Sequence, residues 1–157
     1  MKKVTLYTDG ACSYNPGPGG WAAILTYKGV SKEISGFVPD TTNNRMELFA
    51  ILCGLRQLKE KCDVTIYSDS AYVIEAFTQG WIDSWQTNNW RTSAKKPVKN
   101  SDLWKALLME LGSHKYTFVK VKGHADNEFN NRCDKLATTE VSNAIKNGVY
   151  VYDKKED

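Results

Sequence analysis

The stretch that decides the fold occurs twice, as VTLYTD at residues 4–9 and as VTIYSD at residues 64–69. Both copies have the β-branched and aromatic content of a strand. Because side chains alternate along a strand, the terminal Asp9 and Asp69 each share a face with the Thr and the Tyr of their own copy. Parallel pairing of the two strands would bring both carboxylates to one edge of a sheet, which is where such sheets bind ligands.

The segments around the two copies predict one domain of mixed α/β (α+β) class that covers residues 1–157. Short spacing around Gly29 indicates an antiparallel meander, and the later alternation of strand and helix is typical of parallel pairing. The predicted elements are strands at 3–9, 21–27 and 30–38, with a turn-forming stretch at 10–20, a helix from Asn44 to about Lys61, a strand at 64–69, helices at 71–79 and 101–111, a strand at 116–122, a polar loop at 123–127, a helix at 128–145 and a flexible tail at 146–157.

Composition limits the class of protein. The 157 residues are 41% hydrophobic and 25% charged, which suits a single globular domain. The sequence predicts neither a signal peptide nor a membrane-spanning segment. The cysteines have neither zinc-site nor disulfide spacing, so we expect free thiols and a cytoplasmic protein. They are Cys12, Cys53, Cys62 and Cys133.

The acids at the strand ends form the first candidate site. Taken alone, each Asp is more often a turn or capping residue. Two acids that end matched strands, with Glu47 in the first turn of the following helix, favour a metal site instead. Carboxylates held together repel one another unless a cation lies between them. Hard oxygen ligands indicate Mg²⁺ or Mn²⁺ rather than Zn²⁺.

Six short motifs extend this interpretation from Thr8 to Ala137. They are TDGAC at 8–12, NPGPGG at 15–20, TNNRMEL at 42–48, YSDS at 67–70, VKGHADN at 121–127 and RCDKLA at 132–137. In this order and spacing they resemble the bacterial type 1 ribonuclease H family. The resemblance implies a ribonuclease H-like fold, a five-stranded mixed sheet flanked by helices on both sides. It also implies a monomeric endonuclease that cleaves the RNA strand of RNA/DNA hybrids to products with a 5′ phosphate and a 3′ hydroxyl.

The resemblance assigns the catalytic centre to five side chains. Asp9, Glu47, Asp69 and Asp134 would be metal-binding carboxylates that hold two Mg²⁺ ions with substrate, and Mn²⁺ could substitute. His124 would assist proton transfer or product departure, although a lone surface histidine is usually only solvated. Replacing His124 by Ala should slow cleavage roughly 10²- to 10⁴-fold rather than abolish it.

Contacts to the RNA strand are implied in the same way. Only RNA offers a 2′-hydroxyl as donor and acceptor. The resemblance implies contacts from Asn15, Asn43 and Asn44, and from the backbone around Cys12 and Ser13. The alternative for Asn43 and Asn44 is helix capping, and one of them could serve both purposes.

Contacts to the DNA strand involve a different part of the chain. The resemblance implies that Thr42 and Asn100 hold a phosphate, and that Trp81 and Trp104 form an aromatic floor under the deoxyriboses. For the neighbouring Trp85 and Trp90 we expect hydrophobic packing between helices instead.

Two features depart from the family pattern. The segment after Trp81 reads IDSWQTNNW, with Asp83 and neutral residues at 86–89 where well-known members are strongly basic. Fewer phosphate contacts predict weaker and less salt-sensitive hybrid binding. Ala71 stands where some relatives carry a Gln that contacts RNA, which would remove one contact. The remaining nearby cations are Arg91, Lys95, Lys96 and Lys99.

Two other functions fit parts of the pattern. A hybrid-binding module without catalysis would have the same fold, but the four carboxylates and His124 argue against it. A related nuclease that acts on DNA alone, such as a resolvase or an integrase-like enzyme, would share the acids. The TNNRME motif and the Trp/Lys segment favour hybrids.

Overall fold

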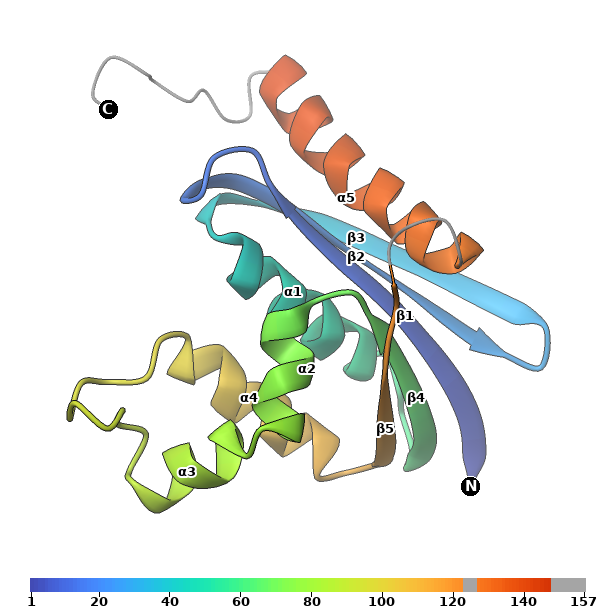
Figure 1. The fold of residues 1–157 in the computed structure, drawn as a ribbon. Helices are drawn as coiled ribbons and strands as arrows, with labels where there is room; N and C mark the ends of the chain where they lie inside the picture. Colours follow the sequence, from blue (N-terminus) through green and yellow to red (C-terminus); the bar gives the residue numbers. More distant parts are fainter. Residues whose placement is uncertain (123–126, 148–157) are drawn as a thin grey trace, which may run out of the picture.

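A computed structural model describes residues 1–122 and 127–147. Its strands form one five-stranded sheet in the order β3-β2-β1-β4-β5 (Figure 1). The elements are β1 (Lys2–Cys12), β2 (Gly17–Tyr27), β3 (Val30–Thr41), α1 (Asn43–Leu55), β4 (Cys62–Ser68), α2 (Ala71–Thr78), α3 (Trp81–Thr87), α4 (Ser101–Leu111), β5 (Lys115–Lys120) and α5 (Glu128–Lys146). The predicted five-stranded mixed sheet is therefore confirmed.

The repeated motif forms the centre of this sheet. Strands β1 and β4 pair in parallel, and the two copies are aligned residue for residue, with Val4 opposite Val64 and Tyr7 opposite Tyr67. The alternation divides the side chains as predicted. Val4 and Val64 enter the larger core, whereas the rings of Tyr7 and Tyr67 stack on the opposite face with centroids 5.1 Å apart. The parallel pairing that the motif predicted is thus present.

The antiparallel meander of β1, β2 and β3 is also confirmed. The predicted turn at 10–20 is wrong in extent, because β1 continues to Cys12 and β2 begins at Gly17. Glycine serves close packing here rather than turning. A Cβ on Gly20 would collide with the backbone carbonyl of Ala137 in α5, and one on Gly10 would lie 2.6 Å from the backbone nitrogen of Glu47 in α1. Both helices therefore approach the strands at glycines.

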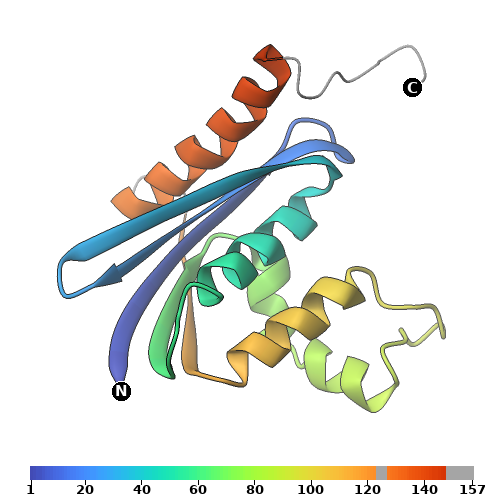
Figure 2. The same cartoon turned by 180° about the vertical axis from the view of Figure 1, so that it is seen from behind.

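Helices lie on both faces of the sheet. The figures place α1, α2 and α4 on one face and α5 across the other (Figures 1 and 2). The larger core includes Leu6 and Ile66 of the sheet, Ile51 of α1 and Trp104 of α4. A smaller core under α5 contains the buried side chains of Ala22, Ile24, Cys133 and Ala137.

Several boundaries differ from the prediction. Helix α1 ends at Leu55 rather than near Lys61. A turn follows it, in which Leu58 N donates to Leu55 O, three residues earlier, at 3.0 Å. The tryptophan-rich segment forms the separate helix α3, which begins after Gly80 at φ 74°. Strand β5 begins and ends earlier than predicted, at Lys115–Lys120. Most of the predicted tail lies outside the described residues.

Within residues 1–122 and 127–147, no helix is both long enough and apolar enough to cross a membrane. All four cysteines have free thiols, in agreement with their spacing.

Candidate metal centre

Three of the predicted carboxylates converge at one end of the paired strands. Asp9 lies near the end of β1, Asp69 directly follows β4, and Glu47 lies on α1. Each offers an oxygen, and these three oxygens lie within 4.8 Å of one another. Glu47 falls in the second turn of α1 rather than in its first, because the helix begins at Asn43. The matched strands therefore place the acids as predicted from their alignment.

The backbone of Gly10 joins two of these acids. Its N–H donates to Asp9 Oδ1 at 3.0 Å and to Glu47 Oε1 at 3.2 Å. This arrangement requires α1 to lie against β1, which the missing side chain of Gly10 permits. The second oxygen, Glu47 Oε2, is buried and has no hydrogen-bond partner among the described residues. A buried carboxylate oxygen without a donor is unfavourable unless a ligand completes it.

Burial raises the pKa values of two carboxyl groups in the cluster, so the fully ionised cluster is unfavourable without a cation. Desolvation, reinforced by the nearby Asp69 carboxylate, raises the pKa of Asp9 to about 7. Desolvation and the charges of Asp9 and Asp69 hold the pKa of Glu47 well above its usual range. A divalent cation would offset the repulsion between the carboxylates and would give the buried Glu47 Oε2 a partner. The ligand atoms are all carboxylate oxygens, and Glu47 Oε2 has no hydrogen-bond partner in the described part of the chain. Both features fit a hard cation such as Mg²⁺ or Mn²⁺.

The fourth predicted carboxylate, Asp134, reaches the cluster from the other face of the sheet. It lies half-buried on α5, close enough to Asp9 for its carboxylate to contribute to the raised pKa of that residue. It is not one of the three acids whose oxygens all lie within 4.8 Å. The four acids thus come from three layers of the fold.

Asn130 is a further residue of the site that the sequence motifs did not indicate. It is buried on α5, and its Nδ2 donates to Thr8 O at 3.1 Å and to Tyr67 O at 3.5 Å. These carbonyls precede Asp9 and Asp69 by one and two residues. A single amide therefore ties α5 to both acid-bearing strands. Its signal was a polar residue on the otherwise apolar face that Cys133 and Ala137 define.

The predicted RNA-side residues gather around the start of α1. Asn15, in the turn between β1 and β2, accepts a hydrogen bond from the backbone N–H of Asn43 at 3.1 Å. The N-cap of α1 is Thr42, whose Oγ1 accepts from Arg45 N at 3.2 Å. Capping by Asn43 or Asn44 is therefore wrong, and both side chains are exposed. The half-buried Cys12 ends β1, and the exposed Ser13 follows it in the β1–β2 turn.

On the predicted DNA side, Thr42 and Asn100 are connected through Arg45. The backbone of Arg45 bonds to Thr42, and its Nη1 donates to Asn100 Oδ1 at 3.3 Å. Trp81 is half-buried. Trp104 is fully buried, and its Nε1 donates to Tyr72 Oη at 2.9 Å. Neither face of the indole is exposed, and its predicted place in the aromatic floor stays a prediction.

Trp85 and Trp90 pack as expected. Both are partly buried against the larger core, with the ring of Trp85 5.4 Å from that of Trp104 and 6.0 Å from that of Trp90. Lys105 lies over the Trp90 ring at 5.5 Å. The cations of the neighbouring loop, Arg91, Lys95, Lys96 and Lys99, are exposed. His124 lies outside the described residues.

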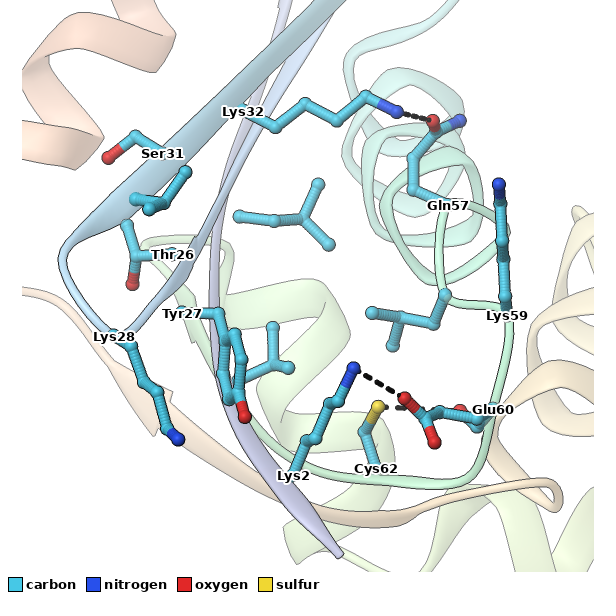
Figure 3. Close-up of a pocket in the computed structure, with 14 residues that line it drawn as sticks. Lys2, Thr26, Tyr27, Lys28, Ser31, Lys32, Gln57, Lys59, Glu60 and Cys62 are labelled. Atoms are coloured by element: carbon cyan, nitrogen blue, oxygen red, sulfur yellow. Dashed lines mark hydrogen bonds and ion pairs between the residues drawn. The ribbon is translucent and has the colours of Figure 1, made fainter.

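A separate hollow of about 530 Å³ lies at the opposite end of β1 (Figure 3). Apolar side chains such as Leu25 and Leu58 form part of its lining, and lysines stand at its edge. Lys2 pairs with Glu60 at 2.6 Å and Lys32 donates to Gln57 at 2.8 Å. It contains none of the predicted site residues, so it is not part of the carboxylate centre.

Comparison with known proteins points to one family. The family model for RNase H matches residues 1–142. A ribonuclease H of Caldanaerobacter subterraneus subsp. tengcongensis is 61% identical over 143 residues, which cover 91% of this chain and 94% of the relative. A ribonuclease H of Chlorobium phaeobacteroides is 59% identical, with 91% and 98% covered.

Solved structures agree in fold. LC9-RNase H1, a type 1 RNase H with the type 2 active-site motif, superposes with a TM-score of 0.81 at 25% identity, covering 91% of this chain and 74% of that one. LC11-RNase H1 in complex with an RNA/DNA hybrid superposes with a TM-score of 0.66 at 22% identity, covering 90% and 99%.

Proposed function

This chain belongs to the ribonuclease H family and is a nuclease of the hydrolase class, and we propose that it cleaves the RNA strand of RNA/DNA hybrids internally. The observation that carries this proposal is the meeting of Asp9, Glu47 and Asp69, whose oxygens lie within 4.8 Å of one another. One buried oxygen of Glu47 has no hydrogen-bond partner among the described residues. The relatives with about 60% identity are ribonucleases H by name. The hybrid bound to LC11-RNase H1 supports the choice of substrate.

The catalytic centre in this proposal consists of Asp9, Glu47, Asp69 and Asp134. Divalent cations bound there would supply an activated water for in-line attack on phosphorus and would stabilise the leaving 3′ oxygen, one ion for each task. Gly10 N–H holds one oxygen each of Asp9 and Glu47, which leaves the other oxygens for metal. The products would carry a 5′ phosphate and a 3′ hydroxyl. Mg²⁺ is the proposed ion, and Mn²⁺ its substitute.

Substrate recognition divides between the two strands. Asn15, Asn43 and Asn44, with the backbone around Cys12 and Ser13, would contact the RNA, where a 2′-hydroxyl can both donate and accept. The exposed Asn43 and Asn44 side chains are free of the capping role that Thr42 fills, which supports this assignment.

The DNA strand would contact a second group of residues, which includes Thr42 at the N-cap of α1. Thr42 and Asn100 would hold a phosphate, and Trp81 would lie under a deoxyribose. His124 would move a proton or help the product leave. We further propose that the protein acts as a monomer in the cytoplasm, where its four free thiols are stable.

A cleavage assay tests the proposal. Purified protein is incubated with end-labelled RNA/DNA hybrid, duplex DNA, duplex RNA and single strands, each with Mg²⁺ or with EDTA. We expect Mg²⁺-dependent internal cuts only in the RNA of the hybrid. Binding of the hybrid without cleavage would instead identify a binding module. Equal cutting of duplex DNA would identify a nuclease of broader specificity.

A further inference from the structure

Asn100 does not behave as the cap of the helix that it precedes. It occupies the N-cap position of α4, where an Asn side chain usually accepts from a free backbone N–H. Within the described part of the chain it makes no such bond, and its backbone is left-handed at φ 62° and ψ 24°. The side chain instead faces Arg45 and Tyr72. A forgone cap is destabilising, so this orientation needs a reason.

Two neighbours fix which way the Asn100 amide points. Arg45 Nη1 lies 3.3 Å from Oδ1, and Tyr72 Oη lies 3.2 Å from Nδ2. A guanidinium carries only donors, so it can face only the oxygen of the amide. The NH₂ group must then point toward Tyr72, with one hydrogen bonded there. Its second hydrogen has no acceptor among the described residues.

Arg45 and Tyr72 are themselves fixed. Arg45 makes a two-pronged contact with Asp102, with nitrogen–oxygen distances of 3.0 and 2.8 Å. Tyr72 Oη accepts from Trp104 Nε1 at 2.9 Å. Because Oη accepts from both Trp104 and Asn100, its own hydrogen remains free to donate. The buried Trp104 thus holds the Tyr72 hydroxyl in place from the core side.

Unused donors therefore collect around Asn100. The second N–H of Asn100 and the hydroxyl of Tyr72 lack acceptors among residues 1–122 and 127–147. Thr42 Oγ1 accepts from Arg45 N, so its hydrogen is also available. Several unpaired donors beside a guanidinium and the N-terminus of α4 suit an anion.

We propose that Arg45 and Tyr72 are positioning residues that orient the Asn100 amide so that its NH₂ group, with Thr42, donates to one phosphate of the DNA strand. This inference rests on the proposed function, since it assumes that a nucleic acid occupies this face. Asp102 holds Arg45, and Trp104 holds Tyr72. The correctly oriented amide presents a donor to the phosphate. A flipped amide would present its oxygen, which repels the anion.

The test measures hybrid affinity with single phosphates neutralised. The DNA strand of a hybrid carries one uncharged methylphosphonate, moved one position at a time. Equilibrium Kd values are measured in an Asp69→Asn background, so that the RNA is not cut during the measurement. We expect one position at which the substitution weakens binding about tenfold, as the loss of a charge-assisted hydrogen bond implies.

Variants then separate orientation from general stability. In Arg45→Leu and Tyr72→Phe, the unmodified hybrid should bind about tenfold more weakly, and the methylphosphonate at that position should have little further effect. Arg45→Lys retains a donor and should keep part of the sensitivity. Arg56→Leu is the matched control, because Arg56 also joins α1 to α4, through Glu110 at 3.5 Å, but lies outside this group. It should bind and respond like the unaltered protein.

Each result has one meaning when the melting temperature shows that the variants are folded. Arg45→Leu or Tyr72→Phe that keeps the full methylphosphonate effect would show a merely structural role and overturn the inference. Absence of a sensitive position in the unaltered background would overturn it as well. Failure of the proposed function appears separately, as absence of RNA cleavage by the protein that retains Asp69.

Discussion

The carboxylate cluster and the group around Tyr72, which consists of Arg45, Asn100, Asp102 and Trp104, both hold polar side chains beside the larger core. They differ in how far these side chains are paired with hydrogen-bond partners or opposite charges. At the cluster, burial raises the pKa of Asp9 to about 7, and Glu47 Oε2 has no partner among the described residues. Around Tyr72, Trp104 and Asn100 both donate to one hydroxyl. The Arg45 guanidinium nearby lowers the pKa of Asp102 to about 2.

The two groups should therefore contribute differently to metal binding and to the free energy of unfolding. The cluster stores unfavourable electrostatics that a bound cation would relieve. The group around Tyr72 contributes to stability before any ligand binds. Changes at the cluster should therefore remove activity and preserve or raise stability, whereas changes at the aromatic group should lower stability first.

The largest expected effect tests the cluster. Asp69→Asn should reduce Mg²⁺-dependent cleavage by more than about 10³-fold, because it removes a charge that holds the cation. The metal-free variant should melt at the same or a higher temperature, since repulsion with Asp9 is relieved. Asp63→Asn is the control, because Asp63 lies on β4, the strand that Asp69 follows, and is not part of the cluster. Unaltered turnover in Asp69→Asn would remove the metal assignment, and loss of folding would indicate a capping role.

The next largest effect concerns the stability that the group around Tyr72 provides. Trp104→Ala should lower the free energy of unfolding by about 3 to 5 kcal/mol, because it empties a fully buried site and leaves Tyr72 Oη with one donor fewer. Trp90→Ala should cost clearly less, since that ring is only partly buried. Urea unfolding followed by circular dichroism measures both. Equal losses would show that Trp104 is not the central packing residue.

A smaller effect concerns pH in the absence of metal. The pKa of Asp9 rises from 3.8 in the unfolded chain to about 7 in the folded one. Between these values the folded state holds a proton that the unfolded chain has released, so the free energy of unfolding falls as pH rises from about 4 to about 7. At about 1.4 kcal/mol for each pKa unit, this shift sets an upper limit of about 4 kcal/mol on the loss from this group.

Thermal melts in EDTA across this pH range measure the loss. Asp9→Asn should flatten the profile, and saturating Mg²⁺ should restore stability at pH 7. Stability that rises from pH 4 to pH 7 in EDTA, with the same slope in Asp9→Asn, would contradict the burial of charge at the cluster.

The smallest expected effect tests whether the loop that carries Lys96 and Lys99 belongs to the hybrid-binding surface. Lys96→Ala with Lys99→Ala should reduce the dependence of log Kd on log salt by about 0.9 for each lysine that contacts a phosphate. The expected loss is small because residues 86–89 carry no cation. Lys59→Ala is the control, since Lys59 lines the hollow at the other end of β1. An unchanged slope in the double variant would place this loop outside the interface.

The sequence predicted what depends on local pattern. The repeated motif determines the alignment of β1 and β4, and therefore the meeting of Asp9 and Asp69. It did not predict the extent of the β1–β2 hairpin, because Gly10 and Gly20 were interpreted as turn residues when their role is to admit helices from elsewhere in the chain. Close approach of distant segments leaves no local signal.

The same limit applies at the candidate site. The identity of the α1 cap and the burial of Trp104 depend on tertiary contacts that motif spacing does not contain. Asn130 was missed for this reason too, since its partners lie 122 and 63 residues away. The single-domain extent, the role of His124 and the substrate contacts stay predictions.

Helix α5 rests on the smaller core of Ala22, Ile24, Cys133 and Ala137, yet it carries Asp134. An element that packs on the smaller of two cores is expected to open by local fluctuation at lower free energy than the elements around the larger core. Native-state hydrogen exchange should therefore find α5 among the first segments to lose protection, while β1 and β4 remain closed. Inactivation by mild denaturant would then begin as a reversible detachment of one helix, well before the sheet unfolds.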